Sequence, residues 1–125
     1  MKNIEVFTDY PLYGFNTLNG DVFSLMFYFK NIYAGLISDF RRGKIEPMIA
    51  ESWDISKDGR EWKFKIRKGL KFTDGEDITP EEVYKSFRRI FWLTRNNKTR
   101  LHKSLVGLEK WDNYEKGFEG IRLEG

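Results

Sequence analysis

The chain of 125 residues is long enough for one domain, and its 40% hydrophobic and 17% aromatic residues supply material for a packed core. Charged residues make up 33% of the chain, but 22 basic and 19 acidic side chains leave a formal net charge of only +3, which is too small to indicate a nucleic-acid partner. The chain contains no cysteine, which excludes disulfides, thiolate metal sites and thiol catalysis.

The first residues do not form a secretory signal, because Glu5 interrupts the apolar stretch that a signal requires. We therefore expect that a signal was removed or that the protein stays inside the cell. The most apolar stretch, residues 22–40, contains Lys30, Asn31 and Asp39. A lysine near the centre of a bilayer costs about 3 kcal/mol, so we interpret this stretch as a buried helix and predict no insertion into the membrane.

The first third of the chain predicts a strand, a loop and a helix. Residues 3–8 alternate in polarity, which favours a short strand, and residues 9–20 have a turn-forming composition. Apolar side chains then recur at helical spacing from Val22 to about Ser38, and Asp21 can cap this helix. Gly43 predicts the connection out of it.

A hairpin is predicted next, with arms at residues 51–56 and 61–67 and a tight turn at the Asp-Gly pair, residues 58–59. Its two faces differ, because Trp62, Phe64 and Ile66 alternate with basic side chains, and Trp53 and Ile55 do the same in the first arm.

A single-stranded nucleic-acid platform is the alternative reading of this basic face. Its basic residues are Lys63, Lys65, Arg67, Lys68 and Lys71. We favour a half-buried strand with solvated lysines, because the aromatic side chains lie on the opposite face from the charges. We therefore predict no nucleic-acid partner for this segment.

A second helix is predicted to start at Thr79, with Thr79 as N-cap, Pro80 as the first helical residue and Glu82 as the reciprocal partner of a capping box. Its predicted core stripe consists of Val83, Phe87, Ile90 and Phe91. A weaker helical pattern follows from Leu101 to Trp111, and residues 121–123 suggest a short strand. The elements together predict a mixed α/β (α+β) fold class.

Catalytic groups are sparse. His102 is the only histidine, so we interpret it as a surface residue without metal ligands or triad partners beside it. Asp74 and Asp77 are close enough for acid–base chemistry, but their position before a helix cap favours turn hydrogen bonds. Gly14 and Gly20 lack the pattern of a phosphate-binding loop. We therefore predict no enzymatic activity, no metal and no cofactor.

Four stretches of the chain resemble, in order and spacing, the opening of the family 5 solute-binding proteins of ABC importers, which include oligopeptide, dipeptide and nickel binders. They are residues 33–37, YAGLI; residues 45–59, IEPMIAESWDISKDG; residues 62–75, WKFKIRKGLKFTDG; and residues 78–87, ITPEEVYKSF. Two family features are replaced here, a Leu-Asp-Pro motif by Phe15-Asn16-Thr17 and an aromatic residue after a serine-proline pair by residues 98–101.

This resemblance implies part of a lobe of the type II periplasmic-binding-protein fold, with a β-hairpin and two main helices. Residues 1–125 would be the N-terminal portion of lobe I, which is an incomplete domain. The implied function is that of the substrate-binding component of an ABC importer, which captures peptides or a similar small solute in an interlobe cleft. The implied partners are that ligand and the importer's membrane subunits, and the implied location is periplasmic or extracytoplasmic.

The resemblance also indicates ligand-binding residues. In peptide-binding members the loop before the first helix lies along the ligand main chain, and this loop corresponds here to Asn19, Gly20, Asp21, Val22 and Phe23. Gly20 permits close approach of backbone, and free N–H groups at a helix start attract carbonyl or carboxylate oxygens. Asp21 fits two roles equally, attraction of a ligand amine and capping of the helix.

Two other functions compete with transport. The same module can serve as the ligand-sensing domain of a cytoplasmic transcriptional regulator, which the lack of a signal and the pI of about 9.1 would suit. The chain could also act alone as an interaction domain. We expect instead that the isolated chain exposes an apolar face and an unpaired sheet edge.

Overall fold

The structure is a computed structural model that describes residues 32–41, 43–96 and 103–124. The chain divides into two units, Met1–Met48 and Ile49–Gly125. The described residues include two antiparallel sheets of two strands, an α-helix of 15 residues and short 3₁₀ turns, which confirms the mixed fold class. The strand predicted at residues 3–8, the loop at 9–20 and residues 22–31 of the first predicted helix lie outside the described residues, and the type II lobe stays a prediction.

In the first unit, β1 (Ile37–Arg41) pairs with β2 (Lys44–Pro47). The prediction that the first helix continues to Ser38 is therefore wrong at its end. Gly35 is unfavourable inside a helix and the β-branched Ile37 favours a strand, so the backbone pairs with β2 instead, with Ile37 opposite Pro47. Gly43, with φ of 77°, lies between the two strands, and its predicted role as the exit from a helix is also wrong.

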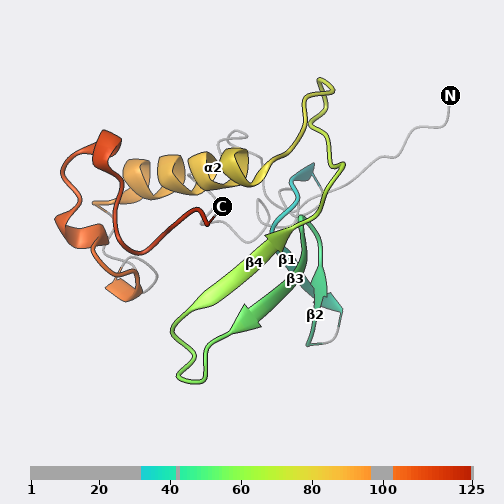
Figure 1. Cartoon of the computed structure of the whole chain (residues 1–125), viewed down its shortest axis with the longest axis horizontal. Helices are drawn as coiled ribbons and strands as arrows, with labels where there is room; N and C mark the ends of the chain where they lie inside the picture. The colour runs from blue at the N-terminus through green and yellow to red at the C-terminus, as the bar shows by residue number, and fades with distance from the viewer. Residues whose placement is uncertain (1–31, 42, 97–102, 125) are drawn as a thin grey trace, which may run out of the picture. The chain divides into compact units, whose positions relative to one another are not determined.

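In the second unit, β3 (Ala50–Ile55) and β4 (Trp62–Ile66) form the predicted hairpin (Figure 1). Gly59 has φ of 72°, and its N–H donates to Ser56 O at 2.9 Å. The Asp58 carboxylate accepts bonds from Ser56 Oγ at 2.6 Å and from the Arg60 N–H at 3.2 Å. The bond from Ser56 is the main cause that lowers the pKa of Asp58. The Asp-Gly turn is thus confirmed.

The register of this hairpin confirms its two faces. Trp53 lies opposite Phe64 and Ile55 opposite Trp62, whereas Asp54 lies opposite Lys63. The Trp62 and Phe64 rings stack with their centres 6.1 Å apart. The outer end of the apolar face is open, because Ile55 is 47% exposed and Trp62 is 45% exposed. An apolar face that is only partly covered matches the expectation for the isolated chain.

The helix α2 (Pro80–Thr94) starts where the sequence predicts. Thr79 has extended backbone angles, and its hydroxyl accepts a hydrogen bond from the Glu82 N–H at 3.3 Å. The reciprocal half of the capping box is not formed by Glu82, whose carboxylate accepts a bond from Lys85 Nζ at 2.7 Å. The Glu81 carboxylate instead interacts with its own backbone N–H and with Thr79, and these bonds, the first above all, lower the pKa of Glu81.

Replacement of Thr79 by alanine is expected to lower the free energy of unfolding by about 1 kcal/mol, because one N–H of the first helical turn loses its acceptor. Urea unfolding followed by circular dichroism measures this difference. Thr79→Ser, which keeps the hydroxyl, serves as the matched control and should lose much less. Equal losses in the two variants would contradict the capping role.

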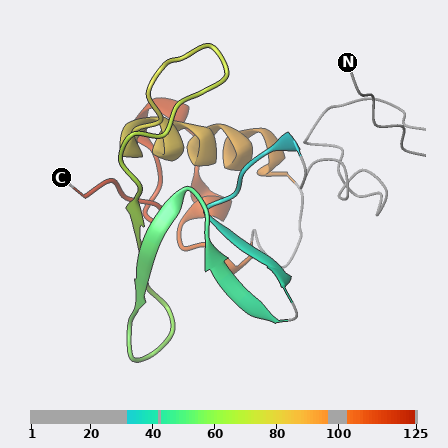
Figure 2. The same cartoon turned by 90° about the vertical axis from the view of Figure 1, so that its right-hand side faces the viewer.

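The core of the second unit lies between α2 and the segment that follows it (Figure 1 and Figure 2). Phe91, Leu108 and Trp111 are buried. Residues packed around them are Phe87, Trp92, Leu105, Tyr114, Phe118 and Ile121. We call these nine side chains the aromatic core.

The segment after α2 differs from its prediction. The helical pattern from Leu101 to Trp111 does not form one helix in its described part, because Gly107 takes φ of 78° and a short 3₁₀ turn, η2 (Leu108–Lys110), follows it. A second turn, η3 (Tyr114–Lys116), comes next, and residues 121–123 are not paired as a strand. The prediction that Ile90 belongs to the core is wrong as well, because Ile90 is 41% exposed.

Candidate ligand-binding site

The ligand-binding residues predicted from the sequence, Asn19, Gly20, Asp21, Val22 and Phe23, lie outside the described residues and stay a prediction. The same holds for His102, for Gly14, for Phe15-Asn16-Thr17 and for residues 98–101. The polar groups considered below therefore belong to the hairpin, to the turn before α2 and to the aromatic core.

The basic face of the hairpin is largely paired with carboxylates. Lys65 forms an ion pair with Glu51 across the two strands, and Lys63 Nζ contacts Glu124 Oε2 at 3.2 Å. The hydrogen bond from Lys65 is the main cause that lowers the pKa of Glu51, and the same bond raises the pKa of Lys65. These contacts favour the interpretation of a solvated strand face, because phosphate binding would need free cations.

The Glu51 pair predicts a dependence of stability on pH. Because the folded-state pKa of Glu51 lies below its ordinary value, the pair stabilises the fold above that ordinary value, and this stabilisation is lost as pH falls through the lowered pKa. Urea midpoints of Glu51→Gln should therefore fall less steeply than those of the wild type between neutral and acidic pH. Glu109→Gln, a change at an exposed carboxylate of η2, is the control and should keep the wild-type slope.

The two aspartates before α2 have structural partners. Asp74 Oδ1 accepts the Glu76 N–H at 3.1 Å, as predicted for a turn. Asp77 Oδ1 accepts a bond from Lys71 Nζ at 2.7 Å, and the same ammonium reaches Gly75 O at 3.2 Å. Each carboxylate is thus engaged within the turn itself, which favours a structural role over acid–base chemistry.

Arg88 is a residue that sequence reasoning missed. Its guanidinium carbon lies 4.6 Å from the centre of the Tyr114 ring and 5.5 Å from that of Tyr84, and its Nη2 donates to Tyr114 O. Its Nε is buried and has no hydrogen-bond partner among the described residues. The spacing of Tyr84 and Arg88, four residues apart on one helix, was the available signal. The contribution of η3 could not be read from spacing.

The contacts of Arg88 tie α2 to η3. Arg88→Met is expected to cost about 1.5–3 kcal/mol in the free energy of unfolding, because the Tyr114 carbonyl loses a charged donor and two rings lose a cation. Chemical denaturation monitored by tryptophan fluorescence measures the loss. Arg89→Met, the same change at the exposed neighbouring arginine, should stay within about 0.5 kcal/mol. A similar loss in both variants would remove Arg88 from this role.

Among the described residues, no cluster of three or more histidine, cysteine, aspartate or glutamate side chains has a geometry that suits a metal ion. No helix within that part of the chain combines the length and the apolar character that a membrane crossing requires.

Comparison with known families defines the class to which these elements belong. The sequence model described as "Bacterial extracellular solute-binding proteins, family 5 Middle" matches residues 44–116, which is more than half of the chain. The match spans β2, the β3–β4 hairpin, α2 and both 3₁₀ turns. The class is therefore that of extracellular solute-binding proteins. The chain belongs to family 5 of this class, which confirms the resemblance recognised in the sequence.

Individual relatives agree with this assignment. Heme-binding protein A of Haemophilus influenzae is 40% identical over 68 residues, which cover 48% of this chain and 12% of that protein. The nickel-binding periplasmic protein of Escherichia coli is 34% identical over 65 residues, or 52% of this chain and 12% of that protein. The oligopeptide-binding protein AmiA of Streptococcus pneumoniae is 44% identical over 45 residues, with 34% and 7% covered.

The chain spans only about 12% of the length of the first two of these relatives. No solved structure matches it significantly. The relatives share the solute-binding class, while their names refer to different ligands, namely heme, nickel and oligopeptides.

Proposed function

We propose that residues 1–125 form the N-terminal portion of lobe I in the substrate-binding component of an ABC importer. This component would capture peptides or a similar small solute in a cleft between two lobes and deliver it to the importer's membrane subunits. The match of residues 44–116 to family 5 carries the proposal. Relatives named for oligopeptides, nickel and heme all match, so the comparisons support solute binding and do not select one solute.

The open apolar face of the hairpin supports an incomplete lobe. Ile55 and Trp62 are each nearly half exposed, although they belong to the face that also carries Trp53 and Phe64. Apolar area that stays in contact with water forgoes about 25 cal/mol per Å² of stabilisation. A remainder of the lobe that covered this face would recover that stabilisation.

The proposed ligand contacts are Asn19, Gly20, Asp21, Val22 and Phe23. Gly20 would let the ligand backbone approach closely, and Asp21 would attract an amine, which a peptide or a cationic solute provides. Three carboxylates of the described residues, Asp74, Asp77 and Glu51, are instead engaged in turns or ion pairs. We propose binding without catalysis, and a periplasmic location, as the names of two relatives from Escherichia coli state for those proteins.

The test is a thermal-shift measurement on the whole polypeptide encoded by the reading frame that contains this chain. A ligand at one hundred times its Kd should stabilise the protein by about 2.7 kcal/mol. The panel contains mixed tri- to pentapeptides, nickel chelates and heme. Gly20→Val and Asp21→Asn should weaken the shift, whereas Lys57→Ala in the exposed hairpin turn should not.

Failure of all three ligand types to raise the melting temperature would contradict solute capture of this kind. A DNA-binding helical segment in the same reading frame would favour the ligand-sensing domain of a cytoplasmic regulator over the importer component. Equal shifts for Gly20→Val and the wild type would contradict the ligand contacts alone and leave the family function standing.

A further inference from the structure

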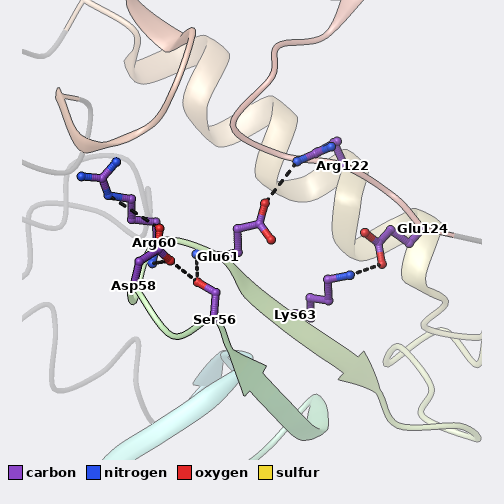
Figure 3. A network of polar contacts seen from close by, with 7 residues as sticks. All are labelled: Ser56, Asp58, Arg60, Glu61, Lys63, Arg122 and Glu124. Carbon is purple, nitrogen blue, oxygen red and sulfur yellow. Dashed lines mark hydrogen bonds and ion pairs between the residues drawn. The ribbon is translucent and has the colours of Figure 1, made fainter.

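The C-terminal segment, residues 121–124, lies along β4 through two ion pairs. Arg122 Nη2 is 3.7 Å from Glu61 Oε1, and Lys63 Nζ is 3.2 Å from Glu124 Oε2 (Figure 3). Glu61, directly before β4, pairs with Arg122, and Lys63 of β4 pairs with Glu124, so the two stretches run in the same direction. No backbone hydrogen bond joins them in the described part of the chain, so these side chains form the polar link between the segment and the hairpin.

The order of charges specifies this arrangement. In residues 61–63, at the start of β4, the signs read negative at Glu61 and positive at Lys63. In the segment they read positive at Arg122 and negative at Glu124. An antiparallel placement would bring Glu61 to Glu124 and Lys63 to Arg122, two pairs of like charge. A parallel placement shifted by two residues either way would also create one such pair. Only the parallel register found in the structure satisfies both pairs.

The start of the segment is held in the aromatic core. Ile121 packs against that core, and Gly120 lies so close to Val106 that an added Cβ would be 2.8 Å from the Val106 carbonyl oxygen. The segment therefore runs from the aromatic core at one end to the polar face of the hairpin at the other. We propose that residues 121–124 are a charge-coded strap that holds the β3–β4 hairpin to the aromatic core within the second unit, in one register.

The strap is expected to respond to salt and to charge order. The four side chains are 61–71% exposed, so the pairs are partly screened by ions. Because exposed pairs contribute little, loss of both should lower the ratio of docked to undocked strap by about five-fold. The strap is thus a weak contact that depends on salt concentration, and within the described residues its backbone is not hydrogen-bonded to the sheet.

The absence of cysteine from the chain allows a direct test. A nitroxide placed on Leu123→Cys, at a residue that is 42% exposed, should broaden the amide signals of residues 61–63 most strongly in the 125-residue chain. Broadening should be roughly ten-fold weaker at Ile66, which is about 13 Å farther along the strand. Raising the salt to 1 M, where the Debye length is about 3 Å, should reduce the broadening without any further mutation.

The decisive variant is Glu61→Lys/Lys63→Glu, which reverses the order of charges in residues 61–63 and keeps the net charge. We expect it to lower the docked ratio by at least about five-fold, because both ion pairs become pairs of like charge, and the further change Arg122→Glu/Glu124→Lys should restore it. Glu109→Lys/Lys110→Glu, the same swap in η2, is the control and should have no effect. An unchanged signal in the reversed variant, no restoration in the fourfold variant, or broadening transferred between labelled and unlabelled chains would overturn the strap.

Discussion

Replacement of Trp111 by alanine is expected to lower the free energy of unfolding by about 3–5 kcal/mol. Trp111 is 6% exposed, and its ring centre lies 4.8 Å from that of Phe118 and 5.0 Å from that of Trp92. Its Nε1 donates to Asn113 O at 2.7 Å, so the variant also removes the donor that this carbonyl oxygen accepts from. Because domains of this size have a total stability of about 5–15 kcal/mol, much of the second unit's margin would disappear.

The matched control for this variant is Trp62→Ala, since Trp62 is 45% exposed on the hairpin. Its loss should be about 1–2 kcal/mol, the sum of partial burial and of a hydrogen bond to Gly59 O at 3.3 Å. Urea unfolding monitored by far-ultraviolet circular dichroism measures both variants without depending on the removed fluorophore. Losses of equal size would mean that the aromatic core does not dominate the stability of this unit.

Replacement of Gly117 by alanine is expected to cost about 2–3 kcal/mol. Gly117 follows η3 with φ of 67° and ψ of −167°, a region that is essentially restricted to glycine. A Cβ added there would also lie 3.4 Å from the Tyr84 hydroxyl and 3.9 Å from Arg88 Nε. The substitution would therefore strain the backbone at the point where Arg88 holds η3 against α2.

Gly59→Ala separates the cost of the backbone conformation from the cost of the close contacts that an added Cβ would make. Gly59 has a similar φ of 72°, but no atom lies within 4 Å of an added Cβ. Its cost should be about 1–2 kcal/mol, the ordinary penalty of a left-handed residue. Chemical denaturation of the two variants under one set of conditions gives the comparison. A smaller loss at Gly117 than at Gly59 would contradict the close packing of η3 on α2.

The parts of the fold that were predictable depend on neighbouring residues. The Asp-Gly pair at 58–59 requires a turn with positive φ at the glycine, and the Thr79-Pro80 pair requires a helix start, whatever lies around them. Alternation in residues 62–66 likewise determines which side chains share a face. The membership in family 5 was also recognisable, because the matching residues follow one another in order along the chain.

The errors arose where a local pattern competes with a distant partner. Ile37 has helical spacing with the residues before it, but the register with Pro47 makes it part of a strand. Leu105, Leu108 and Trp111 also have helical spacing, yet Gly107 breaks the segment, and these side chains still reach the same core through short turns. Periodicity thus predicted which residues are buried more reliably than which helix carries them.

The polar contacts of the chain also include some that the sequence predicts and some that only the structure shows. The contacts proposed at Asn19 to Phe23 follow from family resemblance and remain for experiment. The ion pairs that join Glu61 to Arg122 and Lys63 to Glu124 link residues 61 positions apart in the sequence. The spacing of residues in the sequence cannot predict such pairs. Any exposed charge of opposite sign could be the partner, and only the folded backbone determines which two meet.

The amino-acid sequence by itself determined the hairpin, the capped helix and the family, since turns, caps and alternation are set by steric and hydrogen-bonding preferences within a few residues. Tertiary structure alone decided the end of the first predicted helix, the placement of Arg88 between two tyrosine rings and the parallel course of residues 121–124. These depend on which distant backbone and side-chain groups satisfy one another, and that choice is made by the packing of the whole unit.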